Sequence, residues 1–252
     1  MLEDINTIFF CDETKFSKKD HDPEDAIYYV AIMTDKSQAK TLKDQYFEII
    51  KKFNLQGGFH ASKTLKRNDS KDIMISFTNL IVQNGLRCFC FKYNKSMLFD
   101  LTKRHLGKFT NDIHNFNNSE HQALFYFVTT LISFFLDNPQ FKIGNAAMFF
   151  DRNFHGIQDV ETMLITKKLP VKHLTFTPRD KLTLLALPDY VGYIFRMLKL
   201  SINKVQLGNK ALEISPLVIN ASQNMLAIKD ASLFHYIDIS NWTYEFVNTY
   251  LK

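Results

Sequence analysis

Two short apolar segments, each followed at once by an aspartate, constrain the fold of this 252-residue chain most. Residues Ile8–Cys11 precede Asp12, and Ala147–Phe150 precede Asp151. A strand that is apolar at every position is buried on both faces, so both segments are expected inside a sheet. Ligands of open α/β sheets bind beyond the carboxyl ends of such strands. The sequence therefore predicts that Asp12 and Asp151 lie close together.

Each aspartate alone has a simpler interpretation, because aspartate after a strand is often a turn former or a helix N-cap. Asp189 is harder to explain in this way, since it lies in an apolar helical segment, where an ionised carboxylate needs a partner or a metal. The alternative is that Pro188 begins the helix and leaves Asp189 in its first turn. Repulsion among three gathered carboxylates would be offset by Mg²⁺ or Mn²⁺, which prefer oxygen ligands.

The other apolar patterns predict an α/β fold with a mixed sheet covered by helices. Strands are predicted over residues 5–11, 26–33, 58–62, 86–93, 146–150, 171–177 and 233–239. Helices are predicted over residues 37–53, 73–83, 121–136, 160–168, 181–200 and 242–250. We expect one main domain over residues 1–210 and a C-terminal extension over residues 211–252 that packs on the same domain.

Composition excludes several classes of protein. The N-terminus starts acidic, and the longest apolar runs contain Thr and Ser, so no signal peptide or membrane span is predicted and the expected location is the cytoplasm. The net charge of +5 permits a polyanionic partner such as nucleic acid. The three cysteines, Cys11, Cys88 and Cys90, lie in apolar segments and are interpreted as core residues without disulfide bonds or a zinc site.

Four short motifs, in order and spacing, resemble the landmarks of the domain-of-unknown-function-3800 family of bacterial and phage proteins. They are FFCDET, FHASK, FFDRN and LALPDYVGYIFR, which lie within residues 5–200. Asp12-Glu13-Thr14 is similar to the Asp-Glu-Ser signature of that family. Asp189 matches the aspartate of its Leu-Gln-Leu-Ala-Asp helix, and Gly192 fits the small position beyond it. The resemblance implies a ribonuclease-H-like fold.

The resemblance also implies a function, namely hydrolysis of phosphodiester bonds in DNA or RNA with two divalent ions. Asp12 would bridge the ions, Asp151 and Asp189 would each hold one, and Glu13 would support the site from the opposite side of the strand. His60 would shuttle a proton or contact the scissile phosphate, with a structural histidine as the alternative. The residues expected to contact nucleic acid are Lys63, Lys66, Arg67 and Arg152. The alternatives are a solvated loop for the first three and an ion pair with Asp151 or another acid for Arg152.

Gly58 stands where the family often has a glutamate, and this difference supports a second interpretation. The chain would then be a catalytically degenerate ribonuclease-H-like module that binds nucleic acid, a protein partner or a second copy of itself. An aspartyl phosphatase of the haloacid-dehalogenase type is disfavoured, because its general acid would fall at Thr14. Dinucleotide binding and serine hydrolysis are disfavoured, because their glycine-rich and nucleophile-elbow motifs do not occur.

Overall fold

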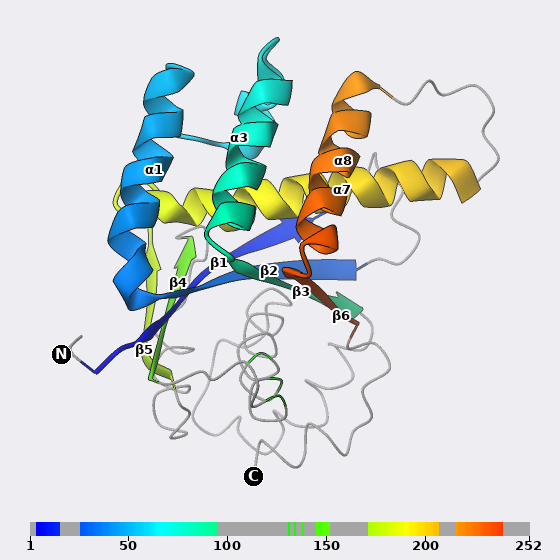
Figure 1. Ribbon diagram of the computed structural model, residues 1–252. Helices are drawn as coiled ribbons and strands as arrows, with labels where there is room; N and C mark the ends of the chain where they lie inside the picture. The colour runs from blue at the N-terminus through cyan, green and yellow to red at the C-terminus, as the bar shows by residue number, and fades with distance from the viewer. Residues whose placement is uncertain are drawn as a thin grey trace, which may run out of the picture.

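A six-stranded mixed sheet is the centre of the fold (Figure 1). The computed structural model describes residues 4–15, 26–94, 145–151, 171–206 and 215–238, with Leu131, Phe134 and Asn138. The strands are β1 (Thr7–Lys15), β2 (Ala26–Asp35), β3 (Arg87–Asn94), β4 (Ala146–Asp151), β5 (Val171–Thr177) and β6 (Phe234–Asp238). Their order across the sheet is β5-β4-β1-β2-β3-β6. The predicted α/β class with a mixed sheet and flanking helices is confirmed.

The pairing of the strands sets where the aspartates lie. Strands β1, β2 and β3 form an antiparallel meander, whereas β4 joins β1 in parallel and β5 joins β4 in parallel. The pairing of β1 with β4 stops at Cys11 and Phe150, so the next residue of each strand is an aspartate. The prediction that the first strand ends at Asp12 was wrong, because β1 continues to Lys15 along β2.

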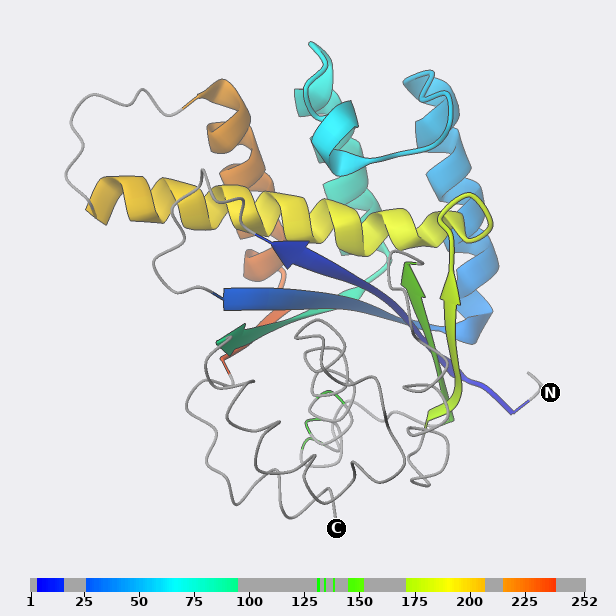
Figure 2. The ribbon, with the colours of Figure 1, turned by 180° about the vertical axis from the view of Figure 1, so that it is seen from behind.

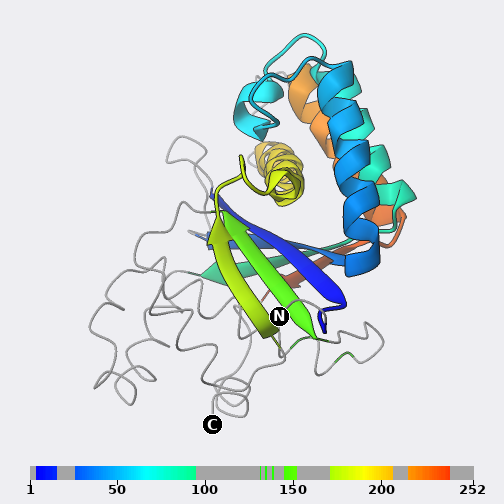
Figure 3. The ribbon, with the colours of Figure 1, turned by 90° about the vertical axis from the view of Figure 1, so that its left-hand side faces the viewer.

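The described helices form two layers on one face of the sheet (Figure 3). They are α1 (Ala39–Lys52), α2 (Ala61–Thr64), α3 (Ser70–Gln83), α7 (Ala186–Gln206) and α8 (Pro216–Asp230), with 3-10 turns at Lys36–Gln38 and Thr183–Leu185. Helix α7 crosses the sheet directly over β1 and β2. Helices α1, α3 and α8 lie outside α7, and α8 packs along both α7 and α3.

The sheet is buried on both faces, as the apolar strands predict. Phe10 and the aromatic rings of α7 and α3 fill the helix-covered side, where Tyr190 donates a hydrogen bond to the Met74 carbonyl (2.8 Å). On the other face Phe89 packs edge to face against Phe134, with ring centroids 5.7 Å apart. All three cysteines are buried and free, which confirms their interpretation as core residues.

The described part of the C-terminal segment completes the sheet. Strand β6 pairs in parallel with the edge of β3, and it confirms the strand predicted over residues 233–239. The helices predicted over residues 160–168 and 242–250, and most of the one over residues 121–136, lie outside the described residues. None of the helices in the described parts of the chain has the length and apolar character needed to cross a membrane.

One predicted strand, over residues 58–62, was wrong. Gly57 and Gly58 adopt φ angles of +81° and +85°, which turn the backbone into the left-handed region that favours glycine. The chain is extended only at His60 before α2 begins at Ala61. The glycine pair therefore ends the α1 unit and delivers a short helix instead of a strand.

Candidate active site

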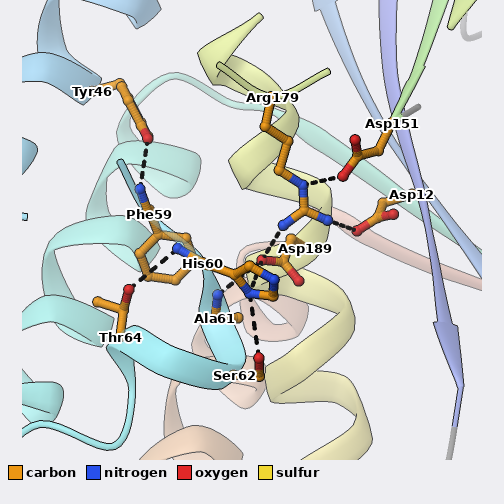
Figure 4. Close-up of polar contacts among 10 residues, drawn as sticks. All are labelled: Asp12, Tyr46, Phe59, His60, Ala61, Ser62, Thr64, Asp151, Arg179 and Asp189. Atoms are coloured by element: carbon orange, nitrogen blue, oxygen red, sulfur yellow. Dashed lines mark hydrogen bonds and ion pairs between the residues drawn. The ribbon is translucent and has the colours of Figure 1, made fainter. Parts of the chain in front are cut away.

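The structure brings the three predicted aspartates together around one arginine, Arg179 (Figure 4). The Nη2 atom of Arg179 lies 2.7 Å from Asp12 Oδ2, and its Nη1 atom lies 2.6 Å from Asp189 Oδ2. The remaining nitrogen, Nε, donates to Asp151 Oδ2. Each carboxylate therefore binds a different nitrogen of the same guanidinium group.

The parallel strands and helix α7 deliver these carboxylates. Asp12 and Asp151 follow the last residues that pair between β1 and β4. Asp189 lies in the first turn of α7, as the alternative expected, although the helix begins at Ala186 and not at Pro188. The helix crosses β1 closely because Gly192 has no side chain, since a Cβ atom there would lie only 3.1 Å from the Cβ of Thr14. The close crossing places Asp189, three residues before Gly192, near Asp12 of β1, and both aspartates bind the same guanidinium group.

Arg179 comes from the turn that follows β5. Strands β4 and β5 point to the same end of the sheet, beneath the start of α7 (Figure 2). After Thr177 the chain turns, and the backbone N–H groups of Lys181 and Leu182 donate to the Pro178 carbonyl (3.0 and 3.1 Å). The sequence analysis did not identify Arg179, although its place just beyond a predicted strand was a signal that could have pointed to it.

The electrostatics of the cluster are dominated by burial. Asp12 and Asp151 are each only 8% exposed. Burial raises the pKa of Asp12 well above its usual value, and the negative charges of Asp189 and Asp151 raise it further, whereas Arg179 acts in the opposite direction. Burial also opposes the charge on Arg179, yet the three carboxylates outweigh it and raise the pKa of the guanidinium. The guanidinium therefore stays charged and only partly offsets the carboxylates.

Asp189 connects the cluster to helix α2 and to His60. Its Oδ2 atom accepts a hydrogen bond from the backbone N–H of Ala61 (2.8 Å) and lies 3.6 Å from His60 Nδ1. The same ring nitrogen lies 3.3 Å from the hydroxyl oxygen of Ser62. The side chain of His60 is half exposed, so it stands at the rim of the cluster, within reach of solvent.

The remaining predicted site residues lie elsewhere. Glu13 follows Asp12 in a regular strand and so points to the opposite face of the sheet. Lys63 and Lys66 are exposed in α2 and the turn after it, and Arg152 lies outside the described residues. Arg67 is exposed and forms an ion pair with Asp69 (2.8 Å), so much of its hydrogen-bonding capacity is already used within the protein.

Gly58, which stands where the resemblance implies a glutamate, places no side chain beside Arg179 in the described part of the chain. A Cβ atom on Gly58 would lie 3.6 Å from the hydroxyl of Tyr46, which accepts a hydrogen bond from the backbone N–H of Phe59 (3.1 Å). These residues border a pocket of about 290 Å³ whose wall also includes Arg179 and Asp180. Asp12, Asp151 and Asp189 are not among the residues that line this pocket.

The chemistry of the donor set fits a hard divalent cation, because three carboxylates converge and already surround a positive group. As placed, no group of three acidic, histidine or cysteine side chains within the described residues has the arrangement of a metal site. The guanidinium explains this arrangement, because it stands between the carboxylates and spreads them around its three nitrogens. No family model, curated protein or solved structure matches this chain. A proposal about function therefore rests on the geometry of the cluster of Asp12, Asp151, Asp189 and Arg179.

Proposed function

We propose that this protein is a divalent-metal-dependent nuclease with a ribonuclease-H-like fold. The observation that carries the proposal is the gathering of Asp12, Asp151 and Asp189, which are remote in sequence, into one buried cluster. Buried carboxylates repel one another and are costly without a compensating cation. The cluster begins where the parallel pairing of β1 with β4 ends, and α/β proteins bind their ligands near the carboxyl ends of parallel strands.

The order of the strands supports the proposed fold. Three consecutive antiparallel strands, with two further parallel strands added beside the first of them, is the arrangement of ribonuclease-H-like sheets, and β1–β5 follow it. Strand β6 is then an addition at the far edge. The motif resemblance to the domain-of-unknown-function-3800 family leads to the same fold independently of the strand order.

The chain's own residues would divide the work as follows. Asp12, which pairs with Val30 of β2 and follows the last residue of β1 that pairs with β4, would be the ligand shared by two ions, while Asp151 and Asp189 would each hold one of them. Bound divalent ions supply an activated water and stabilise the leaving oxygen of an in-line displacement. His60 at the rim is placed to exchange a proton with solvent. Lys63 and Lys66 are placed to contact the backbone of DNA or RNA.

A second candidate is the non-catalytic ribonuclease-H-like module, binding nucleic acid, a protein partner or a second copy. Two observations favour it. Gly58 occupies a left-handed conformation at the place of the family's glutamate, and Arg179 already supplies a positive charge to the cluster. In this alternative Arg179 would be a permanent structural counter-ion.

Metal titration separates the two candidates. Binding of Mn²⁺ is measured by calorimetry for the wild type, for Asp12→Asn and for the control Asp72→Asn, which alters an exposed aspartate in α3. Cleavage of single- and double-stranded DNA and RNA is assayed with Mn²⁺ and with EDTA. Loss of a neighbour of a metal ligand already costs about 10–100-fold in affinity, so Asp12→Asn should cost about 100-fold or more. A wild type that neither binds Mn²⁺ nor cleaves any substrate refutes the nuclease proposal.

A further inference from the structure

Arg179 is bonded to one oxygen of each carboxylate that the proposed divalent ion would use. All three bonds go to Oδ2 atoms of Asp12, Asp151 and Asp189, one from each nitrogen. A Mg²⁺ ion bound through these same three oxygens would lie about 2.0–2.1 Å from each of them, which leaves no room for a guanidinium bonded to the same atoms. Metal and guanidinium therefore cannot both bind the three Oδ2 atoms at once.

We propose that Arg179 is an exchangeable occupant of the metal site. Its guanidinium holds the three carboxylates together when no divalent ion is bound, and leaves them when one binds. The proposal rests on the proposed function and adds how the same site is regulated: the protein carries its own competitor for the metal, which raises the metal concentration needed for loading.

The surroundings of Arg179 permit the exchange. Its side chain is 20% exposed, and it extends from the turn after β5 and not from a strand or helix interior. The same side chain lines the pocket of about 290 Å³ beside Tyr46, Gly58 and Asp180. Because Gly58 carries no side chain, this space is open, and rotation about the side-chain bonds of Arg179 moves the guanidinium toward it and toward the carboxylate of Asp180.

The competition also keeps the empty site intact. Three carboxylates without any cation would repel one another, and β1, β4 and α7 each carry one of them. With the guanidinium in place, these three elements are linked through Asp12, Asp151 and Asp189 before a metal arrives. Loading is then an exchange of one cation for another and does not require the assembly of a dispersed site.

The reduction in metal affinity depends on the fraction of molecules in which Arg179 is bonded to the three aspartates. If Arg179 closes the site in about nine molecules of ten, the apparent metal affinity is reduced about tenfold. Replacing Arg179 with an uncharged residue should therefore tighten Mn²⁺ binding by about tenfold or more. Loss of a merely structural arginine would instead weaken binding, because the carboxylates would no longer be held in place.

The test is calorimetric titration of Mn²⁺ into the wild type, Arg179→Met and the matched control Arg67→Met, which removes an arginine paired with Asp69 outside the site. Tighter binding by Arg179→Met, with Arg67→Met unchanged, supports the exchange. Equal or weaker binding by Arg179→Met overturns it while leaving the proposed function intact. If neither the wild type nor Arg179→Met binds Mn²⁺, the metal site itself is refuted, and the exchange with it.

A measurement on the wild type covers the case in which Arg179→Met does not fold. The Nε–H proton of Arg179 is held by Asp151 and should give a slowly exchanging NMR signal in EDTA. Saturation with Mg²⁺ should abolish this protection. A signal that stays protected in protein shown by calorimetry to be loaded with Mg²⁺ overturns the exchange.

Discussion

Asp189 has two roles in the structure that a pair of substitutions can separate. Its carboxylate is one of the three partners of Arg179, and it also accepts the hydrogen bond from the backbone N–H of Ala61 (2.8 Å). Ala61 is fully buried, so its N–H group has no access to water when this acceptor is removed. Asp189→Asn removes the charge but keeps an oxygen for Ala61, whereas Asp189→Ala removes both.

The difference between the two variants therefore isolates the link between α7 and α2. A buried donor left unsatisfied costs about 1–3 kcal/mol, and an ordinary hydrogen bond contributes about 0.5–1.5 kcal/mol. We expect Asp189→Ala to be about 1–2 kcal/mol less stable than Asp189→Asn. In a chain of this size 1 kcal/mol corresponds to about 2–4 °C in Tm. Both variants should lose metal binding, because both lack the ligand.

The assay is urea denaturation in EDTA, combined with hydrogen exchange at the Ala61 amide. The amide should be protected in the wild type and in Asp189→Asn and should exchange faster in Asp189→Ala. The same pair at Asp72, which is exposed in α3, should differ by about 0.5 kcal/mol or less. Equal stability and equal protection of Ala61 in the two Asp189 variants would show that this hydrogen bond does not hold α2 in place.

Three further predictions concern the core and the charge of the site. Gly192→Ala should lower the free energy of unfolding, measured in urea, by about 1 kcal/mol. Overpacking against Thr14 costs about 1–3 kcal/mol, and the better helix propensity of alanine offsets only about 1 kcal/mol of this. A more stable variant would contradict the close crossing of α7 and β1. Burial raises the pKa of all three cysteine thiols, so a thiol reagent at pH 8 should label them only after unfolding, and rapid labelling of native protein would be the contrary result. Because the pKa of Asp12 is raised on folding, the folded state holds this proton more tightly than the unfolded chain, and the stability in EDTA should fall as the pH rises from about 4 toward the raised value. Asp12→Asn should remove that part of the pH dependence, and an unchanged profile would contradict it.

Much of the fold could be predicted because its signals are local. The strand over residues 171–177 has the predicted limits, since a run with β-branched residues lies between two prolines, Pro170 and Pro178. The helix predicted from residue 181 begins later, at Ala186, because a 3-10 turn precedes it. Gly57 and Gly58 misled the prediction, since a pattern of side chains does not reveal that the backbone has turned to positive φ.

The site divides in the same way. Asp12 and Asp151 were identified because an aspartate that interrupts an apolar run is unusual, and Asp189 because it interrupts an apolar helix. Arg179 follows a proline in a polar turn, where a charged residue is ordinarily solvated. What makes it part of the site is the position of β5 beside β4, and this pairing between distant segments leaves no mark in the local sequence.

A cluster of like charges requires a cation, but this requirement does not say which cation. Here Arg179 is a cation supplied by the chain itself, whereas a divalent ion would be a cation bound from solution. The proposed function favours a divalent ion because Arg179 compensates the negative charge only in part. The pKa of Asp12 stays raised although Arg179 is bonded to it, because burial and the carboxylates of Asp151 and Asp189 outweigh one guanidinium. An ion with twice the charge, placed at shorter distance from the same oxygens, would offset more of that cost. The stability in EDTA compared with saturating Mn²⁺ is therefore the quantity that distinguishes a structural arginine cluster, which gains nothing from the metal, from a site built to exchange its arginine.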